Sequence, residues 1–151
     1  MKKLLLMTLL TSGAFAATTA TLNLTGTIAP VVEIEINGAA SASATVDLLD
    51  KTAQSVATVT ETSNDADGYD ITISSANSGS LNNGTADSAT YTLGYGGASY
   101  NLSSVATVDN AGVVGSTDRA VTVTVTDART DAFDFASGSY TDTVTFEITA
   151  K

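Results

Sequence analysis

The segment GYDITISS, residues 68–75, decides the fold class of this 151-residue chain. Its apolar residues Tyr69, Ile71 and Ile73 alternate with the polar residues Asp70 and Thr72. An alternation of period two places one set of side chains on each face of a strand. The segment therefore predicts a β-strand with one buried face.

The same alternation recurs elsewhere, with many β-branched residues, which favour strands. The recurrences are VVEIEIN (31–37), AVTVTVTD (120–127) and SYTDTVTFEITA (139–150). In TLGYGGASYNL (92–102), two glycines separate two alternating stretches, as in a tight hairpin. No stretch shows sustained helical periodicity. We therefore expect an all-β fold, a single antiparallel immunoglobulin-like β-sandwich of about seven or eight strands over residues 31–151.

The tyrosines of the chain are candidates either for sugar stacking or for core packing. They are Tyr69, Tyr91, Tyr95, Tyr100 and Tyr140. All five stand in strand-like segments beside Ile, Leu or Val, and the chain has no tryptophan. Core packing is therefore the preferred interpretation.

The first sixteen residues are typical of a secretory signal peptide. Lys2 and Lys3 precede the apolar run LLLMTLL, and small residues lead up to Ala16. The run is much shorter than the roughly 20 apolar residues of a membrane span, so we expect no membrane insertion. We expect cleavage after Ala16 and export of the mature chain.

Charge and composition exclude several classes of function. The mature chain would carry four basic and sixteen acidic residues, a net charge of −12, which disfavours nucleic acid as a partner. The absence of histidine and cysteine removes the usual serine, cysteine and zinc chemistries. A hydrolase that uses two carboxylates stays open in principle. However, the acidic residues fall in turns and on polar strand faces, so we expect no enzyme, no catalytic residues and no cofactor.

The acidic turn SNDADG raises the question of a calcium site. Asp65, Asp67 and Gly68 match the third, fifth and sixth places of an EF-hand loop. Ser63 and Ser74 occupy the first and twelfth places, where carboxylates would be needed. An Asx turn before a strand explains the residues better, so no metal site is expected.

The segment TATLNLTGTIAP, residues 19–30, alternates too. Leu22, Leu24, Gly26 and Ile28 share one face, and Pro30 ends the run because it lacks a backbone donor. The residues alone allow two interpretations. The segment is either the first strand of its own sandwich or a strand that pairs with another chain.

Four segments together resemble the pilin-like subunits of the chaperone–usher pathway, closest to the spore coat protein U domain and fimbrial major subunits. These segments are LNLTGTIAP (22–30), GYDITISSANSGSL (68–81), YTLGYGGASYNL (91–102) and ASGSYTDTVTFEITA (136–150). Their order and spacing carry the resemblance. The chain departs from most coat-protein-U-type domains in having no cysteine.

The resemblance implies a structural subunit that polymerises by donor-strand exchange. Residues 17–30 would form the donor extension, with Leu22, Leu24 and Ile28 in the groove of the next subunit and Gly26 where the backbone must approach closely. It also implies identical or related subunits, a periplasmic chaperone and an outer-membrane usher as partners, and a final place at the cell surface. The alternative is a secreted monomeric module for carbohydrate binding or calcium-dependent adhesion.

Overall fold

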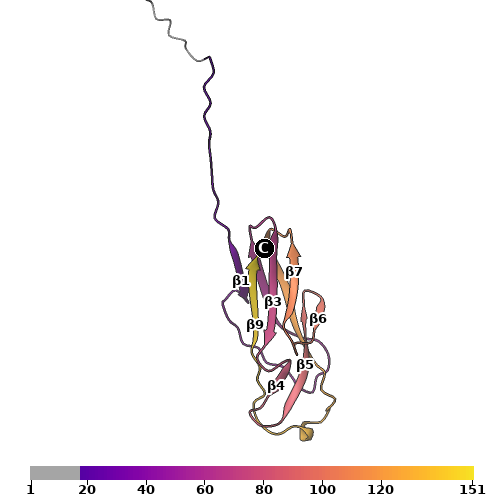
Figure 1. The fold of residues 1–151 in the computed structure, drawn as a ribbon. Coiled ribbons are helices and arrows are strands. Elements are labelled where there is room, and N and C mark those ends of the chain that lie inside the picture. The colour runs from indigo at the N-terminus through magenta and orange to yellow at the C-terminus, as the bar shows by residue number, and fades with distance from the viewer. Residues whose placement is uncertain (1–17) are drawn as a thin grey trace, which may run out of the picture.

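The computed structural model describes residues 18–151, whose strands form two antiparallel sheets packed face to face (Figure 1). This confirms the predicted all-β sandwich. The predicted signal peptide, residues 1–16, lies outside the described residues.

The larger sheet has six strands. Its first five are hydrogen-bonded neighbours in the order β1-β2-β8-β5-β4, and β6 pairs with β5. Their bounds are β1 Val32–Ile36, β2 Gln54–Ser63, β4 Ser80–Asn82, β5 Ser88–Tyr95, β6 Ala98–Tyr100 and β8 Gly115–Val125. β1 therefore lies at one edge of this sheet.

The smaller sheet has three strands in the order β7-β3-β9. Their bounds are β3 Gly68–Ser75, β7 Ala106–Ala111 and β9 Val144–Ala150. The closing strand β9 pairs with β3 along its whole length and has no second neighbour in its sheet. It lies beside β1, the edge strand of the other sheet, and runs in the opposite direction (Figure 1).

The apolar core comes from the middle strands of both sheets. Buried side chains alternate along β3, β5 and β8, as the sequence patterns predict. The cluster consists of Val59, Tyr69, Ile71, Ile73, Tyr91, Leu93, Tyr95, Leu102, Val121 and Val123. The core interpretation is thus confirmed for Tyr69, Tyr91 and Tyr95.

The predicted glycine hairpin is confirmed. β5 and β6 are joined by Gly96 and Gly97, whose φ angles are 58° and 88°. Two successive positive φ values suit the primed turns of tight hairpins, and glycine adopts them without steric cost.

Two details differ from the sequence-based expectation. Residues 18–151 form nine strands rather than seven or eight, and the three-residue strand β4 is too short to show a clear alternation. β9 begins only at Val144, although the alternating pattern starts at Ser139. Tyr140 consequently lies in a loop, where its ring packs edge-on against Phe135 rather than in the core.

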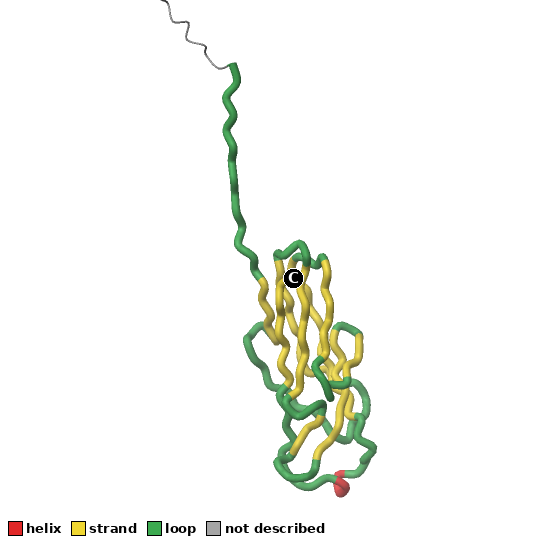
Figure 2. Tube along the Cα trace, in the orientation of Figure 1, coloured by secondary structure: helices red, strands yellow, loops and turns green. Residues whose placement is uncertain are grey.

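Residues 18–30 form no strand and point away from the sandwich as an extended tail that leaves it at the start of β1 (Figure 2). The one helical element in the described part of the chain is the 3-10 turn Ala132–Asp134 at the opposite end. Within residues 18–151, no helix has the length and apolar character to cross a membrane.

Candidate assembly site

The extended tail, residues 18–30, exposes three large aliphatic side chains. Leu22, Leu24 and Ile28 are 81%, 86% and 86% exposed. They share one face of the alternating segment, so they form a row of apolar side chains in water. Gly26 lies in the same row. A Cβ atom added at Gly26 would meet nothing within 4 Å, and its φ lies outside the left-handed region. The isolated chain therefore gives no local reason for glycine at this position.

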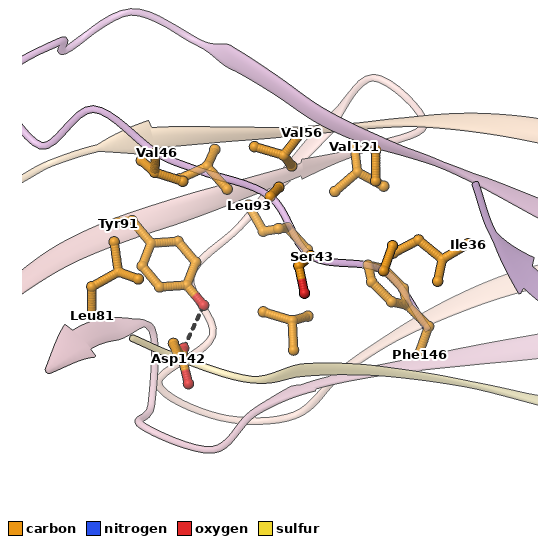
Figure 3. A pocket seen from close by; sticks show the side chains of 15 residues that line it. Ile36, Ser43, Val46, Val56, Leu81, Tyr91, Leu93, Val121, Asp142 and Phe146 are labelled. Atoms are coloured by element: carbon orange, nitrogen blue, oxygen red, sulfur yellow. Dashed lines mark hydrogen bonds between the residues drawn. The ribbon is translucent and has the colours of Figure 1, made fainter. Parts of the chain in front are cut away.

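An apolar groove runs along β9 on the side away from β3 (Figure 3). One wall is the start of β9, with Val144 and Phe146, and the other is the chain from Ile36 to Val46. The floor comes from the core strands and includes Leu93. The middle of the groove is a cavity of about 170 Å³. An apolar cavity of roughly 150 Å³ accommodates a benzene ring, so this one is large enough for a Leu or Ile side chain.

The groove extends beyond this cavity in both directions. Toward the end of β9, it is bounded by Ile34 and Phe146. Toward the start of β9, it passes Leu81 and reaches Tyr140. Each of these sections shares lining residues with the middle one, so the three sections lie next to one another along the flank of the sandwich.

The side chains along this flank are only partly buried. Ile71 and Ile73 on β3 are 0% exposed, whereas Val144, Phe146 and Ile148 on the neighbouring β9 are intermediate in exposure although their side chains face the core. The inward residues of β1 show the same intermediate exposure. The core is thus closed in the middle of the sandwich and incomplete between β1 and β9.

β9 also carries a backbone edge that has no partner strand among residues 18–151. Ala76 N–H donates to Thr143 O at 2.9 Å, and Lys151 N–H donates to Gly68 O at 3.3 Å. Bonding alternates along an antiparallel ladder, so the odd-numbered residues of β9 face β3. The N–H and C=O groups of Val144, Phe146 and Ile148 therefore point toward the groove, where another strand could pair with them.

Asp142 anchors the start of β9 and lines the groove. Its carboxylate accepts a hydrogen bond from Tyr91 Oη at 2.6 Å (Figure 3). It also accepts from Ser75 Oγ at 2.6 Å and from Asn77 N–H at 3.0 Å. Burial raises the pKa of Tyr91, and the bond to Asp142 raises it further. Asp142 thus connects β3 of the smaller sheet and β5 of the larger sheet, and it positions the first residues of β9 beside the groove.

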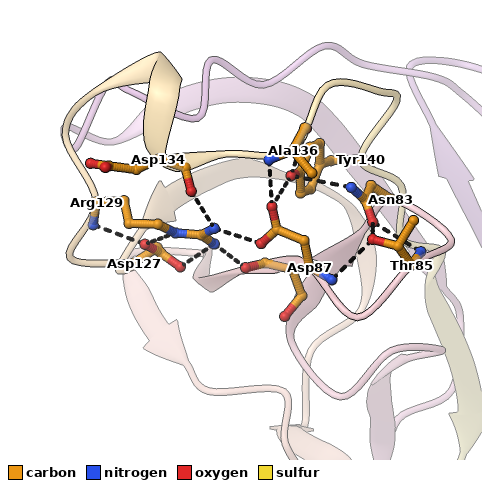
Figure 4. Close-up of polar contacts among 9 residues, drawn as sticks. Asn83, Thr85, Asp87, Asp127, Arg129, Asp134, Ala136 and Tyr140 are labelled. Atoms are coloured by element: carbon orange, nitrogen blue, oxygen red, sulfur yellow. Dashed lines mark hydrogen bonds and ion pairs between the residues drawn. The ribbon is translucent and has the colours of Figure 1, made fainter.

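A second polar cluster fastens the loop that precedes β9 (Figure 4). The Arg129 guanidinium pairs with Asp127 at 2.8 Å and Asp87 at 2.5 Å, and its carbon lies 3.9 Å from the centroid of the Phe135 ring. Asp87 also accepts from Tyr140 Oη at 2.5 Å and from Ala136 N–H at 2.7 Å. This cluster fixes the loop at the end of the groove opposite to the tail.

Two backbone hydrogen bonds show at which end of the sandwich the tail is attached. Asn64 N–H donates to Val31 O at 3.1 Å, and Lys151 N–H donates to Gly68 O. Asn64 and Gly68 bound the turn between β2 and β3, so the start of β1 and the end of β9 lie at the same end of the sandwich. The tail is attached at this end.

The structure does not bring the predicted donor residues to the groove of the same chain. Leu22, Leu24, Gly26 and Ile28 remain in the exposed tail. The sequence analysis did not identify Asp142 as an anchor of β9, although Asp142 stands in the closing segment that carries the resemblance. No local sequence pattern indicates the roles of Arg129 and Asn64.

The acidic turn between β2 and β3 forms the predicted Asx turn. Asp67 N–H donates to Asp65 Oδ1 at 3.0 Å. Among residues 18–151, no group of three His, Cys, Asp or Glu side chains is arranged to hold a metal ion.

Comparisons with known proteins assign no family to the chain. No family model matches it, and no curated protein is significantly similar to it in sequence.

Proposed function

We propose that the protein is a structural subunit of an extracellular fibre or surface coat, and that it polymerises when the tail of one copy enters the groove of the next. One observation carries the proposal. The same chain has a row of exposed aliphatic side chains, at Leu22, Leu24 and Ile28, and an incompletely covered apolar groove beside a free strand edge.

The tail suits the groove in side-chain character. Burial of a large aliphatic side chain contributes about 1.5–3 kcal/mol, so burial of all three would strongly stabilise a docked tail. Gly26 has no neighbours in the isolated chain, and a docked strand supplies a reason for it, namely close contact between its backbone and the groove floor. The alternate residues, such as Thr25, would face water.

The backbone suits the groove as well. A strand that lies beside β9 pairs with the outward N–H and C=O groups of Val144, Phe146 and Ile148, as in other cases of β-strand addition. This pairing extends the smaller sheet by one strand. It also covers the half-buried side chains between β1 and β9.

Strand direction favours a neighbouring copy as the donor. The tail leaves its own sandwich at the end where β9 finishes, so insertion into its own groove would require a sharp reversal and would place it parallel to β9. A copy that approaches from the opposite end inserts its tail antiparallel to β9. Antiparallel pairing is slightly more stable per residue, and no reversal is needed. The expected product is a head-to-tail chain of subunits.

The same proposal includes the partners that assembly requires. An unfilled groove beside a free edge is prone to aggregation, so a subunit in transit needs a protein that covers it. We propose a periplasmic chaperone for this task and an outer-membrane usher for export to the surface. The proposal includes no enzymatic activity and no cofactor.

The test compares substitutions on the two faces of the tail. Leu24→Asp or Ile28→Asp places a charge in the apolar groove and should abolish multimers while secretion continues. Thr25→Asp adds the same charge to the face directed at water and should leave assembly intact. The measurement is the ladder of multimers on gels run in mild detergent without boiling.

Two results would contradict the proposal. One is a wild-type protein that stays monomeric at high concentration in the presence of its export machinery. The other is a Leu24→Asp variant that forms the same ladder as Thr25→Asp, because the apolar face would then be irrelevant to assembly.

A further inference from the structure

We infer that Asn64 is a positioning residue that clasps the root of the tail and holds it away from the chain's own groove, so that the occupant of each groove is the tail of a second copy. This inference rests on the proposed function and adds to it the means by which self-insertion is avoided.

Asn64 makes three hydrogen bonds to the root of the tail, which we define as residues 29–31, where the tail joins β1. Its backbone N–H donates to Val31 O at 3.1 Å. Its side-chain Oδ1 accepts from Val31 N–H at 2.7 Å, and its Nδ2 donates to Ala29 O at 3.0 Å. The side-chain amide thus binds the backbone carbonyl before Pro30 and the backbone N–H after it.

The side chain takes the place of a missing strand. β2 ends at Ser63, and the chain turns away toward β3, so the ladder between β1 and β2 would stop at Val32. The Asn64 amide presents the same two groups that a continuing backbone would present. The root therefore stays extended and leads into the start of β1 (Figure 1), whereas β2 ends at Ser63.

Insertion into the chain's own groove would break this clasp. The groove lies between β1 and β9, on the edge of β1 that faces away from β2. To reach it, the chain must reverse within Ala29, Pro30 and Val31. The clasp holds the Ala29 carbonyl and the Val31 N–H toward Asn64, and Pro30 fixes its own φ near −65°, so both restraints oppose the reversal.

The experiment uses cysteine reporters in the mature chain, which has no cysteine of its own. Both reporter pairs combine the water-facing Thr149→Cys on β9 with a cysteine in the tail. In a head-to-tail chain the far end of the tail reaches Thr149, so Thr21→Cys reports insertion into another copy. After reversal the near end reaches Thr149, so Thr27→Cys reports insertion into the same copy. A short bifunctional maleimide captures either pair.

Three variants test the clasp. Asn64→Ala removes both side-chain bonds, and Asn64→Asp keeps the acceptor for Val31 but loses the donor to Ala29. Asn37→Gly is the matched control, because Asn37 Oδ1 accepts from Thr58 N–H at 2.8 Å at the far end of the same strand pair. Glycine suits the φ of 51° at that position.

We expect Asn64→Ala to raise the intramolecular Thr27–Thr149 cross-link and to slow multimer formation by about tenfold, the effect of losing two modest hydrogen bonds. Asn64→Asp should fall between Asn64→Ala and wild type, and Asn37→Gly should behave as wild type. Circular dichroism should show the same folded sandwich in all variants.

The inference is overturned if Asn64→Ala gives no more intramolecular cross-link than wild type. This readout does not need polymers. A wild-type chain that never forms the Thr21–Thr149 ladder would defeat the proposed function, while the intramolecular cross-link would still decide the role of Asn64.

Discussion

Glu61 is the most deeply buried charged residue among those the structure describes. Its side chain is 0% exposed, accepts from Tyr69 Oη at 2.8 Å and Tyr95 Oη, and pairs with Arg119 at 3.2 Å. Burial, assisted by the bond to Glu61, raises the pKa of Tyr69 to about 12. Both tyrosines thus stay protonated, and their hydroxyl groups donate to the carboxylate at neutral pH. The cluster joins β2, β5 and β8 of one sheet to β3 of the other.

The Glu61 cluster gives a stability prediction. Glu61→Ala removes the acceptor of two buried hydroxyl groups and the partner of Arg119, so it should destabilise the domain by about 3–5 kcal/mol. Glu61→Gln keeps an acceptor in nearly the same volume and should cost less. Urea unfolding measures the difference, and equal stability of Glu61→Ala and wild type would show that the cluster does not join the sheets.

A cluster of charged side chains holds the loop between β8 and β9. Its central cation is Arg129, and Asp87 and Asp127 are its anionic partners. The hydrogen bond from Tyr140 is the largest influence that lowers the pKa of Asp87, and the bond from Arg129 is the largest that lowers the pKa of Asp127. Folding therefore favours the charged form of both carboxylates.

Acid should loosen this loop. A carboxylate whose pKa is lower in the folded state stabilises the fold above its unfolded pKa of about 3.9 and loses this effect as the pH falls further. We expect the free energy of unfolding to decrease between pH 5 and pH 2. Arg129→Met removes the shared cation and should flatten the dependence. Urea titration at each pH measures the free energy of unfolding. An equally steep decrease of this free energy in Arg129→Met would contradict this role for Arg129.

The sequence predicts those elements whose signal is local. The alternation in β3 and β8 and the double glycine at Gly96 and Gly97 each specify their own structure, and the structure confirms them. The start of β9 could not be predicted, because it depends on contacts between Asp142 and Asn77, which are 65 residues apart. The cluster in the loop before β9 could not be predicted for the same reason, because it joins Arg129 to Asp87, which is 42 residues away.

The tail shows the limit of the alternation signal. Residues 19–30 carry a clear period-two pattern, yet they form no strand in the single chain. A strand needs a hydrogen-bonding partner as well as a suitable sequence, and within residues 18–151 the bond from Asn64 to Ala29 is the only one that the tail receives. The donor role of Leu22, Leu24, Gly26 and Ile28 therefore stays a prediction, supported by their exposure and by the groove.

Head-to-tail insertion would produce an open assembly rather than a closed dimer. The tail and the groove are different surfaces of one copy, and heterologous contacts of this kind generate rings or filaments. The tail leaves one end of the sandwich, and a neighbour's tail would enter from the other end (Figure 2). Each copy would thus have a donor end and an acceptor end, as a subunit of a long fibre requires.

Hydrogen exchange at the outward backbone amides of β9 tests strand insertion most directly. The amides of Val144, Phe146 and Ile148 should exchange slowly in wild-type polymers, because an inserted strand bonds to them, and quickly in the Leu24→Asp variant. The amides of Thr145 and Glu147 face β3 and should be protected in both, which provides an internal control. Equal exchange of Val144, Phe146 and Ile148 in the two proteins would contradict donation of the tail to a neighbouring sandwich.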